Sequence, residues 1–305
     1  MIDLSIIVVS YNTCKLTSEC IRSVVDNTKK TKYEVLVVDN GSTDGSVKTI
    51  SALKSRVTNL HIIKNKKNLG FAKANNQGLA IAKGRYILLL NSDTVIHDNV
   101  LGEMIGWMDK HESTGIASCA LRNTDGSMQG TGGYFPTLIS VFSWMTIQDL
   151  PFVDRLIKPF HPMRQKSFAK GDAFYTKERD LDWVTGAFFL IRRGVFEDVG
   201  YFDEDYFMYT EETDYCYRAK RKGWKVKYLP KWSIAHHGGA SGESWSHVIP
   251  EYKGIKLFYK KHFPSWQYLV LRLLLKVGAL GRIFLFGLLE GKEAVKVYAK
   301  AFKIA

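Results

Sequence analysis

The sequence predicts an α/β fold in which a mostly parallel sheet is flanked by helices and followed by an amphipathic helical tail. Over residues 1–120, four short runs rich in Val, Ile and Leu alternate with helical patterns. Such runs are typical of strands buried on both faces, and strands that alternate with helices form a parallel sheet. Residues 266–305 instead form a long apolar helical pattern with a few basic residues. We therefore expect a tail that is distinct from the sheet.

The first half of the chain contains the expected βαβ elements. Its four apolar runs each end in a polar cluster, and they lie at residues 6–9, 35–38, 60–63 and 86–90. After the first run, Leu16, Cys20 and Val24 repeat at every fourth position, which predicts an amphipathic helix. Another helix is expected over residues 72–82, because Gly84 follows it as a stop signal.

The regular pattern is lost over residues 132–182. Prolines occur there among aromatic residues that look exposed, namely Phe135, Phe142, Trp144, Phe152 and Phe160. We interpret this segment as a long loop with a functional role. After it, residues 181–193 predict a strand and residues 209–217 predict a helix.

The composition is that of an ordinary globular protein, with 46% hydrophobic and 24% charged residues among 305. The formal net charge is +13, and residues 253–305 alone carry eleven Lys and Arg against two acids, a balance of +9. An anionic partner is therefore expected at the tail. A nucleic-acid partner is disfavoured, because no nucleic-acid-reading motif is present. The four cysteines form no metal or disulfide pattern, and we expect a cytoplasmic protein without signal peptide or membrane-spanning stretch.

The tail combines a broad apolar face, Trp266 and a narrow basic stripe formed by Arg272, Lys276 and Arg282. The three basic residues fall within one sector of a helix, and the combination is typical of a helix lying in a membrane interface. We expect peripheral contact with an anionic membrane. The alternative is a helical pair that packs on the core or on a second subunit, so a homodimer also stays open.

Polar residues follow three of the expected strands, as Ser10-Tyr11-Asn12, Asp39-Asn40-Gly41 and Asn91-Ser92-Asp93. Ligands of open α/β sheets bind beyond the carboxyl ends of the strands. There, Asp39 could accept a hydrogen bond from a ribose or base, and Tyr11 offers a ring for stacking. Asp93 suits Mg²⁺ or Mn²⁺ bound to a diphosphate, although Asp93 and Asp44 are also typical helix caps. No GxGxxG fingerprint follows the first strand, which argues against a nicotinamide enzyme.

Three carboxylates, Glu211, Glu212 and Asp214, lie within four residues. Crowded carboxylates raise one another's pKa, which suits a general base near neutral pH. The alternative is an acidic helix face that pairs with the basic residues after it, Arg218, Lys220 and Arg221. Further on, His236 and His237 precede two glycines and add candidate metal ligands.

Seven motifs occur in order along residues 3–245: VVSYN, VVDNGSTDGS, NLGFAKANNQGL, LLLNSDT, DWVTGAFFLIRR, FDEDYFMYTEETDYC and HHGGAS. In this combination the chain resembles glycosyltransferase family 2, in its rhamnosyltransferase-like branch. The resemblance implies a GT-A fold, with a nucleotide-binding half at 1–120, an acceptor-facing half at 121–250 and a basic amphipathic tail at 251–305. It implies that Tyr11 and Asp39 hold the nucleoside. The remaining nucleotide-binding residues would be Ser10, Asn12, Asn40, Asp44, Asn68, Gly70, Asn75, Asn91 and Ser92.

The resemblance also implies a divalent metal, Mg²⁺ or Mn²⁺. Asp93 would be the surviving acid of the family's DXD motif, whose first acid is Asn91 here, and His236 or His237 would complete the site. Glu212 occupies the position of the family's catalytic aspartate, and this departure leaves Glu211 and Asp214 in contention. Residues beside the sugar or acceptor would be Trp183, Thr185, Gly186 and Ala187.

The implied reaction is an inverting transfer of a sugar from a nucleotide diphosphate to a saccharide or lipid-linked saccharide in cell-surface polysaccharide synthesis. The branch favours L-rhamnose from dTDP-rhamnose, with UDP-linked hexoses or N-acetylhexosamine as alternatives. The enzyme is expected at the inner face of the cell membrane. Because of the Glu-Glu pair and Asn91, a catalytically inactive protein that binds nucleotide sugars or glycans stays open as the alternative.

Overall fold

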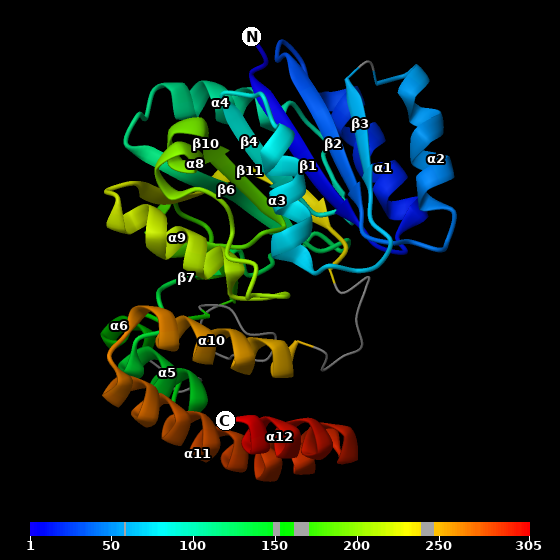
Figure 1. The fold of residues 1–305 in the computed structure, drawn as a ribbon. Helices are drawn as coiled ribbons and strands as arrows, with labels where there is room; N and C mark the ends of the chain where they lie inside the picture. Colours follow the sequence, from blue (N-terminus) through cyan, green and yellow to red (C-terminus); the bar gives the residue numbers. More distant parts are fainter. Residues whose placement is uncertain (58, 149–152, 162–170, 239–246) are drawn as a thin grey trace.

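The structure is a computed structural model, and it describes residues 1–57, 59–148, 153–161, 171–238 and 247–305. A mixed sheet lies at its centre with helices on both sides, and a separate layer of helices lies below it (Figure 1). This confirms the α/β class with a helical tail.

Strands and helices alternate in the first part of the chain, as the apolar runs predict. The elements are β1 (Leu4–Ser10), α1 (Cys14–Asn27), β2 (Tyr33–Asp39), α2 (Ser46–Ala52), the short 3₁₀ helix η1 (Leu53–Ser55), β3 (Leu60–Lys64), α3 (Phe71–Ile81), β4 (Tyr86–Leu90), β5 (Thr94–Val95) and α4 (Val100–Asp109). In β1, Ile6 and Val8 belong to one hydrophobic core and Ile7 to another. Both faces of the strand are therefore buried, which explains why its sequence shows no polar alternation.

The rest of the chain contains strands and helices of very unequal length. They are β6 (Thr114–Arg122), β7 (Gly132–Gly133), α5 (Leu138–Met145), α6 (Val153–Leu156), α7 (Gly171–Phe174), β8 (Arg179–Leu181), β9 (Trp183–Val184), β10 (Phe188–Arg192), α8 (Arg193–Val199), α9 (Glu211–Arg221), β11 (Lys225–His236), α10 (Val248–His262), α11 (Ser265–Glu290) and α12 (Lys292–Ile304). The strand expected over residues 181–193 is thus split into β9 and β10, and the helix expected from residue 209 begins at Glu211.

Within the described residues, the main sheet has the order β3-β2-β1-β4-β10-β6-β11-β5, with β8 beside β11. β1, β2, β3 and β4 pair in parallel, whereas β10 runs antiparallel to both β4 and β6. Phe188 at the start of β10 therefore pairs with Leu90 at the end of β4. At the end of β11, His236 pairs with Thr94. This register brings residues 185–187 and His236 to the edge where Ser10, Asp39 and Asn91 follow their strands.

The irregular segment that follows β6 is partly helical, and its aromatic residues are more buried than the sequence suggests. Trp144 on α5 is 5% exposed and Phe160 is 2% exposed. Helices α10 and α11 cover Trp144, since Tyr252 of α10 lies beside it and Arg282 of α11 stacks on its ring, while Phe160 packs against Trp144 and Trp183. The expectation that these two residues are exposed is wrong, because the residues that cover them come later in the chain and no local pattern shows them. Phe142 is 43% exposed, as expected, and Phe152 lies outside the described residues.

Helices α11 and α12 form an antiparallel hairpin, the hairpin layer at the bottom of Figure 1. Arg272 donates to the carbonyl of Ala305 at 2.9 Å, and the ammonium group of Lys276 lies over the ring of Phe302. Arg282 is buried and donates to the Trp144 carbonyl at 2.8 Å. The basic stripe therefore turns inward, and the expectation that it faces a partner surface is wrong. In the described chain, no helix is long and apolar enough to span a membrane.

Candidate functional site

The ends of β1 and β2 form the first part of the site. Asp39 is 2% exposed, and one carboxylate oxygen accepts a hydrogen bond from the Ser42 amide at 3.1 Å. The other oxygen is buried without a hydrogen-bond partner in the part of the chain that the structure describes. Such an orphaned acceptor is costly unless a ligand supplies a donor. The neighbouring Tyr11 is 41% exposed, which leaves its ring available for stacking.

The turn after β1 is tied to the turn after β2. Asn12 has a left-handed backbone (φ +52°), its amide donates to the Ser42 hydroxyl at 2.9 Å, and its side-chain oxygen accepts from the Thr43 amide at 2.8 Å. Ser10 is fully buried and shares its hydroxyl with Thr17 at 2.9 Å. Both side chains are therefore engaged within the protein, where they hold the backbone at the edge of the sheet.

Asn40 connects this edge to the loop before α3. Its side-chain amide donates to the Asn68 oxygen at 2.9 Å, and its own oxygen accepts from the Leu69 amide at 3.0 Å. Gly70 has a left-handed backbone (φ +86°), and a Cβ there would lie 2.4 Å from the carbonyl oxygen of Phe207. The loop that precedes α9 is therefore packed directly on the loop that precedes α3, which we call the nucleotide-side loop.

Two predicted nucleotide-binding residues are engaged within the protein. One oxygen of Asp44 accepts from the amide of Cys14 at 2.8 Å, and the other accepts from the amide and hydroxyl of Ser46 at 3.1 and 2.5 Å. Although burial opposes it, these hydrogen bonds lower the pKa of Asp44. Asp44 thus joins the first turns of α1 and α2, although the N-cap positions are occupied by Thr13 and Gly45. Asn75 is 1% exposed and donates to the Phe71 carbonyl at 3.0 Å.

The candidate metal centre lies where β4 and β11 end. A carboxylate oxygen of Asp93 lies 3.2 Å from Nε2 of His236, and the side chain of Asn91 lies 3.3 Å from the same nitrogen. Ser92 contributes a hydroxyl contact to Thr13 at 3.2 Å. Although burial opposes it, the hydrogen bond and charge of His236 lower the pKa of Asp93.

Gln129 orients the imidazole of His236, and no sequence motif pointed to it. Its side-chain nitrogen donates to the His236 carbonyl at 2.7 Å, so its oxygen faces Nδ1 at 2.7 Å and accepts a hydrogen bond from the ring there. In the neutral ring, Nε2 then keeps the lone pair that a metal uses, whereas in the protonated ring Nε2 donates to Asp93. His237 contributes its backbone amide to the Asp93 carbonyl at 2.9 Å, and its side chain is exposed.

The carboxylates at the start of α9 are the candidate base. Glu211 is 4% exposed, Glu212 is partly buried, and each has a buried carboxylate oxygen without a hydrogen-bond partner among the described residues. Burial raises the pKa of Glu212 to about 7, and the charge of Glu251 adds to the rise. Burial, with the charge of Glu212, also raises the pKa of Glu211 well above its ordinary value. Of the two, Glu212 is the more exposed.

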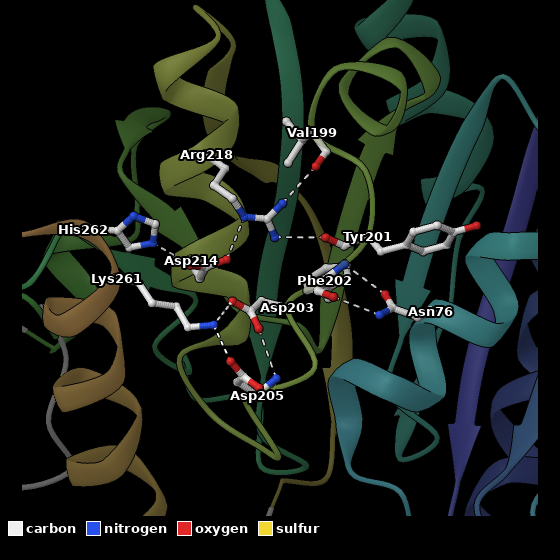
Figure 2. Close-up of polar contacts among 10 residues, drawn as sticks. All are labelled: Asn76, Val199, Tyr201, Phe202, Asp203, Asp205, Asp214, Arg218, Lys261 and His262. Atoms are coloured by element: carbon white, nitrogen blue, oxygen red, sulfur yellow. Dashed lines mark hydrogen bonds and ion pairs between the residues drawn. The ribbon is translucent and has the colours of Figure 1, made fainter.

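Asp214 has a different environment, which Figure 2 shows. Arg218 donates to one of its oxygens at 2.8 Å, and His262 of α10 contacts the other at 2.6 Å. Burial opposes ionisation, but these two partners lower the pKa of Asp214. Arg218 also donates to the carbonyls of Val199 and Tyr201 at 3.0 Å each. Asp214 therefore holds the loop before α9 in place, and the geometry favours Glu212 over Asp214 as the base.

Two further contacts fix this loop. Lys261 of α10 bridges Asp203 and Asp205, and the side chain of Asn76 on α3 bonds both the amide and the carbonyl of Phe202 (Figure 2). The backbone then passes through two consecutive left-handed residues, Tyr209 (φ +67°) and Thr210 (φ +76°), before α9 begins. Such conformations are strained for residues with side chains and persist only where the surroundings enforce them.

Glu251, whose charge acts on Glu212, forms a pair with His161 that sequence reasoning missed. His161 contacts Glu251 of α10 at 2.5 Å, and burial of Glu251 is outweighed by the charges of His161, His247 and Arg282, which lower its pKa. The side chain of Glu251 is only 17% exposed. Because these residues come from segments far apart in the chain, no local motif could have linked them to Glu212.

The residues predicted to face sugar or acceptor lie at the same edge, but three are packed inward. Trp183 is 7% exposed and donates to the Tyr134 carbonyl at 3.1 Å, and Ala187 is 2% exposed in the core. A Cβ on Gly186 would lie 2.9 Å from the ring of Phe71, so the glycine accommodates a protein side chain. Thr185 is only partly buried.

Comparison with known proteins identifies the family. The family model described as "Glycosyl transferase family 2" matches residues 5–200, more than half of the chain. The chain belongs to this family. Its sheet and helices form the GT-A arrangement, which confirms the fold implied by the motifs.

Curated relatives place this family member near the rhamnosyltransferases. It is 26% identical over 246 residues to N-acetylglucosaminyl-diphospho-decaprenol L-rhamnosyltransferase of Mycobacterium tuberculosis, covering 76% of each chain. It is 26% identical over 184 residues to rhamnosyltransferase WbbL of Escherichia coli K12, covering 58% of this chain and 64% of that one. The chain is therefore a rhamnosyltransferase-like glycosyltransferase.

A solved structure shares the fold at low sequence identity. The mannosyltransferase PcManGT from Pyrobaculum calidifontis, in complex with GDP-Man and Mn²⁺, superposes with a TM-score of 0.58 and 16% identity. The match covers 98% of this chain and 73% of that chain.

Proposed function

We propose that this family 2 glycosyltransferase catalyses an inverting transfer in which Glu212 is the general base. Glu212 removes the proton from an acceptor hydroxyl, and the oxygen bonds to the anomeric carbon. The bond between that carbon and the diphosphate breaks, and the nucleotide diphosphate leaves with the electron pair. The observation that carries the proposal is the buried, unpartnered carboxylate oxygen of Glu212, beside a loop packed on the nucleotide-side edge.

Asp93 and His236 would hold the metal. A carboxylate oxygen and an imidazole nitrogen 3.2 Å apart suit Mn²⁺, or Mg²⁺ with more water ligands. Within the described residues, no group of three or more His, Cys, Asp and Glu side chains could hold a metal alone, so diphosphate oxygens would complete the coordination. When bound, the metal supplies positive charge that stabilises the departing diphosphate. Asn91 and Gln129 orient His236.

The donor site would be formed by Tyr11 and Asp39, with Asn40, Asn68 and Gly70 setting the loop beside them. We propose dTDP-rhamnose as donor and a lipid-linked saccharide as acceptor, in cell-surface polysaccharide synthesis. The names of the two relatives support this choice: one transfers L-rhamnose to a diphospho-decaprenol glycan. Such an acceptor places the enzyme at the inner face of the cell membrane. The nucleotide half would be 1–120, the acceptor half 121–250 and the tail 251–305.

The test is nucleotide release from dTDP-rhamnose and a panel of UDP-sugars, with membrane extract as acceptor source and with Mn²⁺, Mg²⁺ or chelator. We expect release from one donor that requires the metal. Gln129→Leu should weaken Mn²⁺ binding about 10- to 100-fold, because the imidazole loses its orienting partner, while leaving the Glu212 region intact.

An inactive binding protein would behave differently. It would be stabilised against heat by dTDP or UDP yet release none from any donor, and that result would contradict the proposed function.

A further inference from the structure

The outward face of α11 is apolar along its whole length. Its exposed residues recur at every third or fourth position from Trp266 to Leu289. Leu269, Leu273 and Phe284 are 65%, 62% and 72% exposed, and Leu288 is 88% exposed. At 1.5 Å per residue, the 26-residue helix presents this row over roughly 39 Å. So long an apolar row on one face marks an interaction surface.

This orientation is fixed by contacts on the opposite face of the helix. Arg282 is buried between the rings of Trp144 and Tyr298, at 4.9 and 5.7 Å from their centroids. Gly278 packs so closely on Met145 that a Cβ would lie 2.5 Å from its sulfur. Turning the helix to bury its apolar row would pull a guanidinium group out of these contacts. The apolar row therefore faces outward because the contacts of Arg282 and Gly278 hold the opposite face of the helix against the protein.

The second helix of the hairpin presents positive charge. Lys292, Lys296, Lys300 and Lys303 on α12 are exposed and recur along one face. Both α11 and α12 pack against α10, so their outward faces lie on the side of the molecule away from the sheet, at the bottom of Figure 1. Within the described residues of α12, Glu293 is the single acidic residue, and it pairs with Lys296 at 2.6 Å.

We propose that the α11–α12 hairpin is a membrane-docking surface, on which the apolar row of α11 inserts into the interface of an anionic bilayer. The helix lies in the plane of the membrane, and the α12 lysines contact the lipid headgroups. A second copy of the chain fits this surface less well, because the exposed lysines of two α12 helices would meet face to face. The charges that contact lipid are thus those of α12, whereas the basic stripe of α11 secures the hairpin.

This inference deepens the proposed function by naming the surface that would meet the membrane of a lipid-linked acceptor. Its experiment needs no turnover. A failure of the transfer assay would leave it standing, and a failure of docking would leave the transfer proposal standing.

The test is vesicle flotation of the full chain. Vesicles of phosphatidylcholine with about 30% phosphatidylglycerol are compared with phosphatidylcholine alone. We expect the protein to float with the anionic vesicles, and the triple variant L273D/F284D/L288D to lose at least about tenfold in bound fraction. These side chains are exposed, so the thermal unfolding temperature should not change. Ile81→Asp, at a 43% exposed apolar position on α3, is the matched control and should float normally.

Two further measurements separate lipid from other occupants. The variant K296Q/K300Q/K303Q should lose the preference for anionic vesicles, and light scattering should report a monomer. The proposal is overturned if the unaltered chain does not float, or if the triple aspartate variant floats as well as the unaltered chain. A dimer that the triple aspartate variant converts to monomer, without vesicle binding, would assign the surface to a second copy instead.

Discussion

Replacing Glu212 with glutamine should stabilise the protein at alkaline pH while abolishing transfer. Burial raises the pKa of Glu212 from 4.5 to about 7 in the folded chain. The folded state therefore keeps the proton at pH values where the unfolded chain has released it, and stability falls as the pH rises from about 4.5 through about 7. At roughly 1.4 kcal/mol per pKa unit, the ionised group costs on the order of 3 kcal/mol above this window. Glutamine carries no charge and avoids this cost.

The assay is urea unfolding of the unaltered chain and E212Q at pH 5 and pH 8. The free energy of unfolding of the two proteins should differ little at pH 5, and E212Q should be more stable by about 2–3 kcal/mol at pH 8. Glu112, which is exposed, provides the control: E112Q should follow the unaltered chain at both pH values. An E212Q variant that is less stable than the unaltered chain at pH 8 would refute the reasoning.

Transfer should respond in the opposite direction. Loss of a general base lowers the rate about 10²- to 10⁴-fold, and in the unaltered enzyme the rate should rise with pH through about 7 as Glu212 ionises. Turnover that survives in E212Q would move the base to Glu211.

Two further substitutions, one of them with a matched control, test the scaffold around the site. Gly70→Ala should cost about 3 kcal/mol of stability and weaken dTDP binding by calorimetry, because its Cβ meets the Phe207 carbonyl in a strained backbone. Gly45→Ala has the same left-handed strain with no atom within 4 Å and should cost about 1 kcal/mol, so equal losses would show that the Phe207 contact contributes nothing. Asp214→Asn should cost about 3 kcal/mol in urea unfolding, because Arg218 loses its buried counter-charge and His262 loses its carboxylate partner. A loss below about 1 kcal/mol would contradict the role of Asp214 as an anchor.

The first 120 residues were predictable because their signals are local. A strand buried on both faces is a short apolar run, and the polar residue after it lies at the edge of the sheet, as Asp39 and Asp93 do. The antiparallel strand β10 was harder to foresee. Its residues also form an apolar run, and such a run does not show whether the strand will be parallel or antiparallel to its neighbours. The division of residues 181–193 into two strands is therefore seen only from the strand pairing in the structure.

Long-range partners account for most of what the sequence could not reveal. Glu251 reaches the surroundings of Glu212 from a helix 39 residues later, and its ion-pair partner His161 comes from the other side of the sequence. Likewise, the inward direction of Arg282 depends on the Trp144 carbonyl, 138 positions away. A helical pattern shows that a helix has two faces, and only the neighbours decide which of them is covered.

The contact between the loop before α9 and the nucleotide-side loop bears on the kinetic order of binding. The amide of Phe71, the first residue of α3, donates to the carbonyl of Phe207 at 2.7 Å, four residues before the helix that carries Glu212, the proposed base, begins. A nucleotide that orders the Asn68–Gly70 turn would therefore also order the backbone leading to Glu212. We expect donor to bind before acceptor, so that the hydroxyl arrives only when the carboxylate that deprotonates it is already in position.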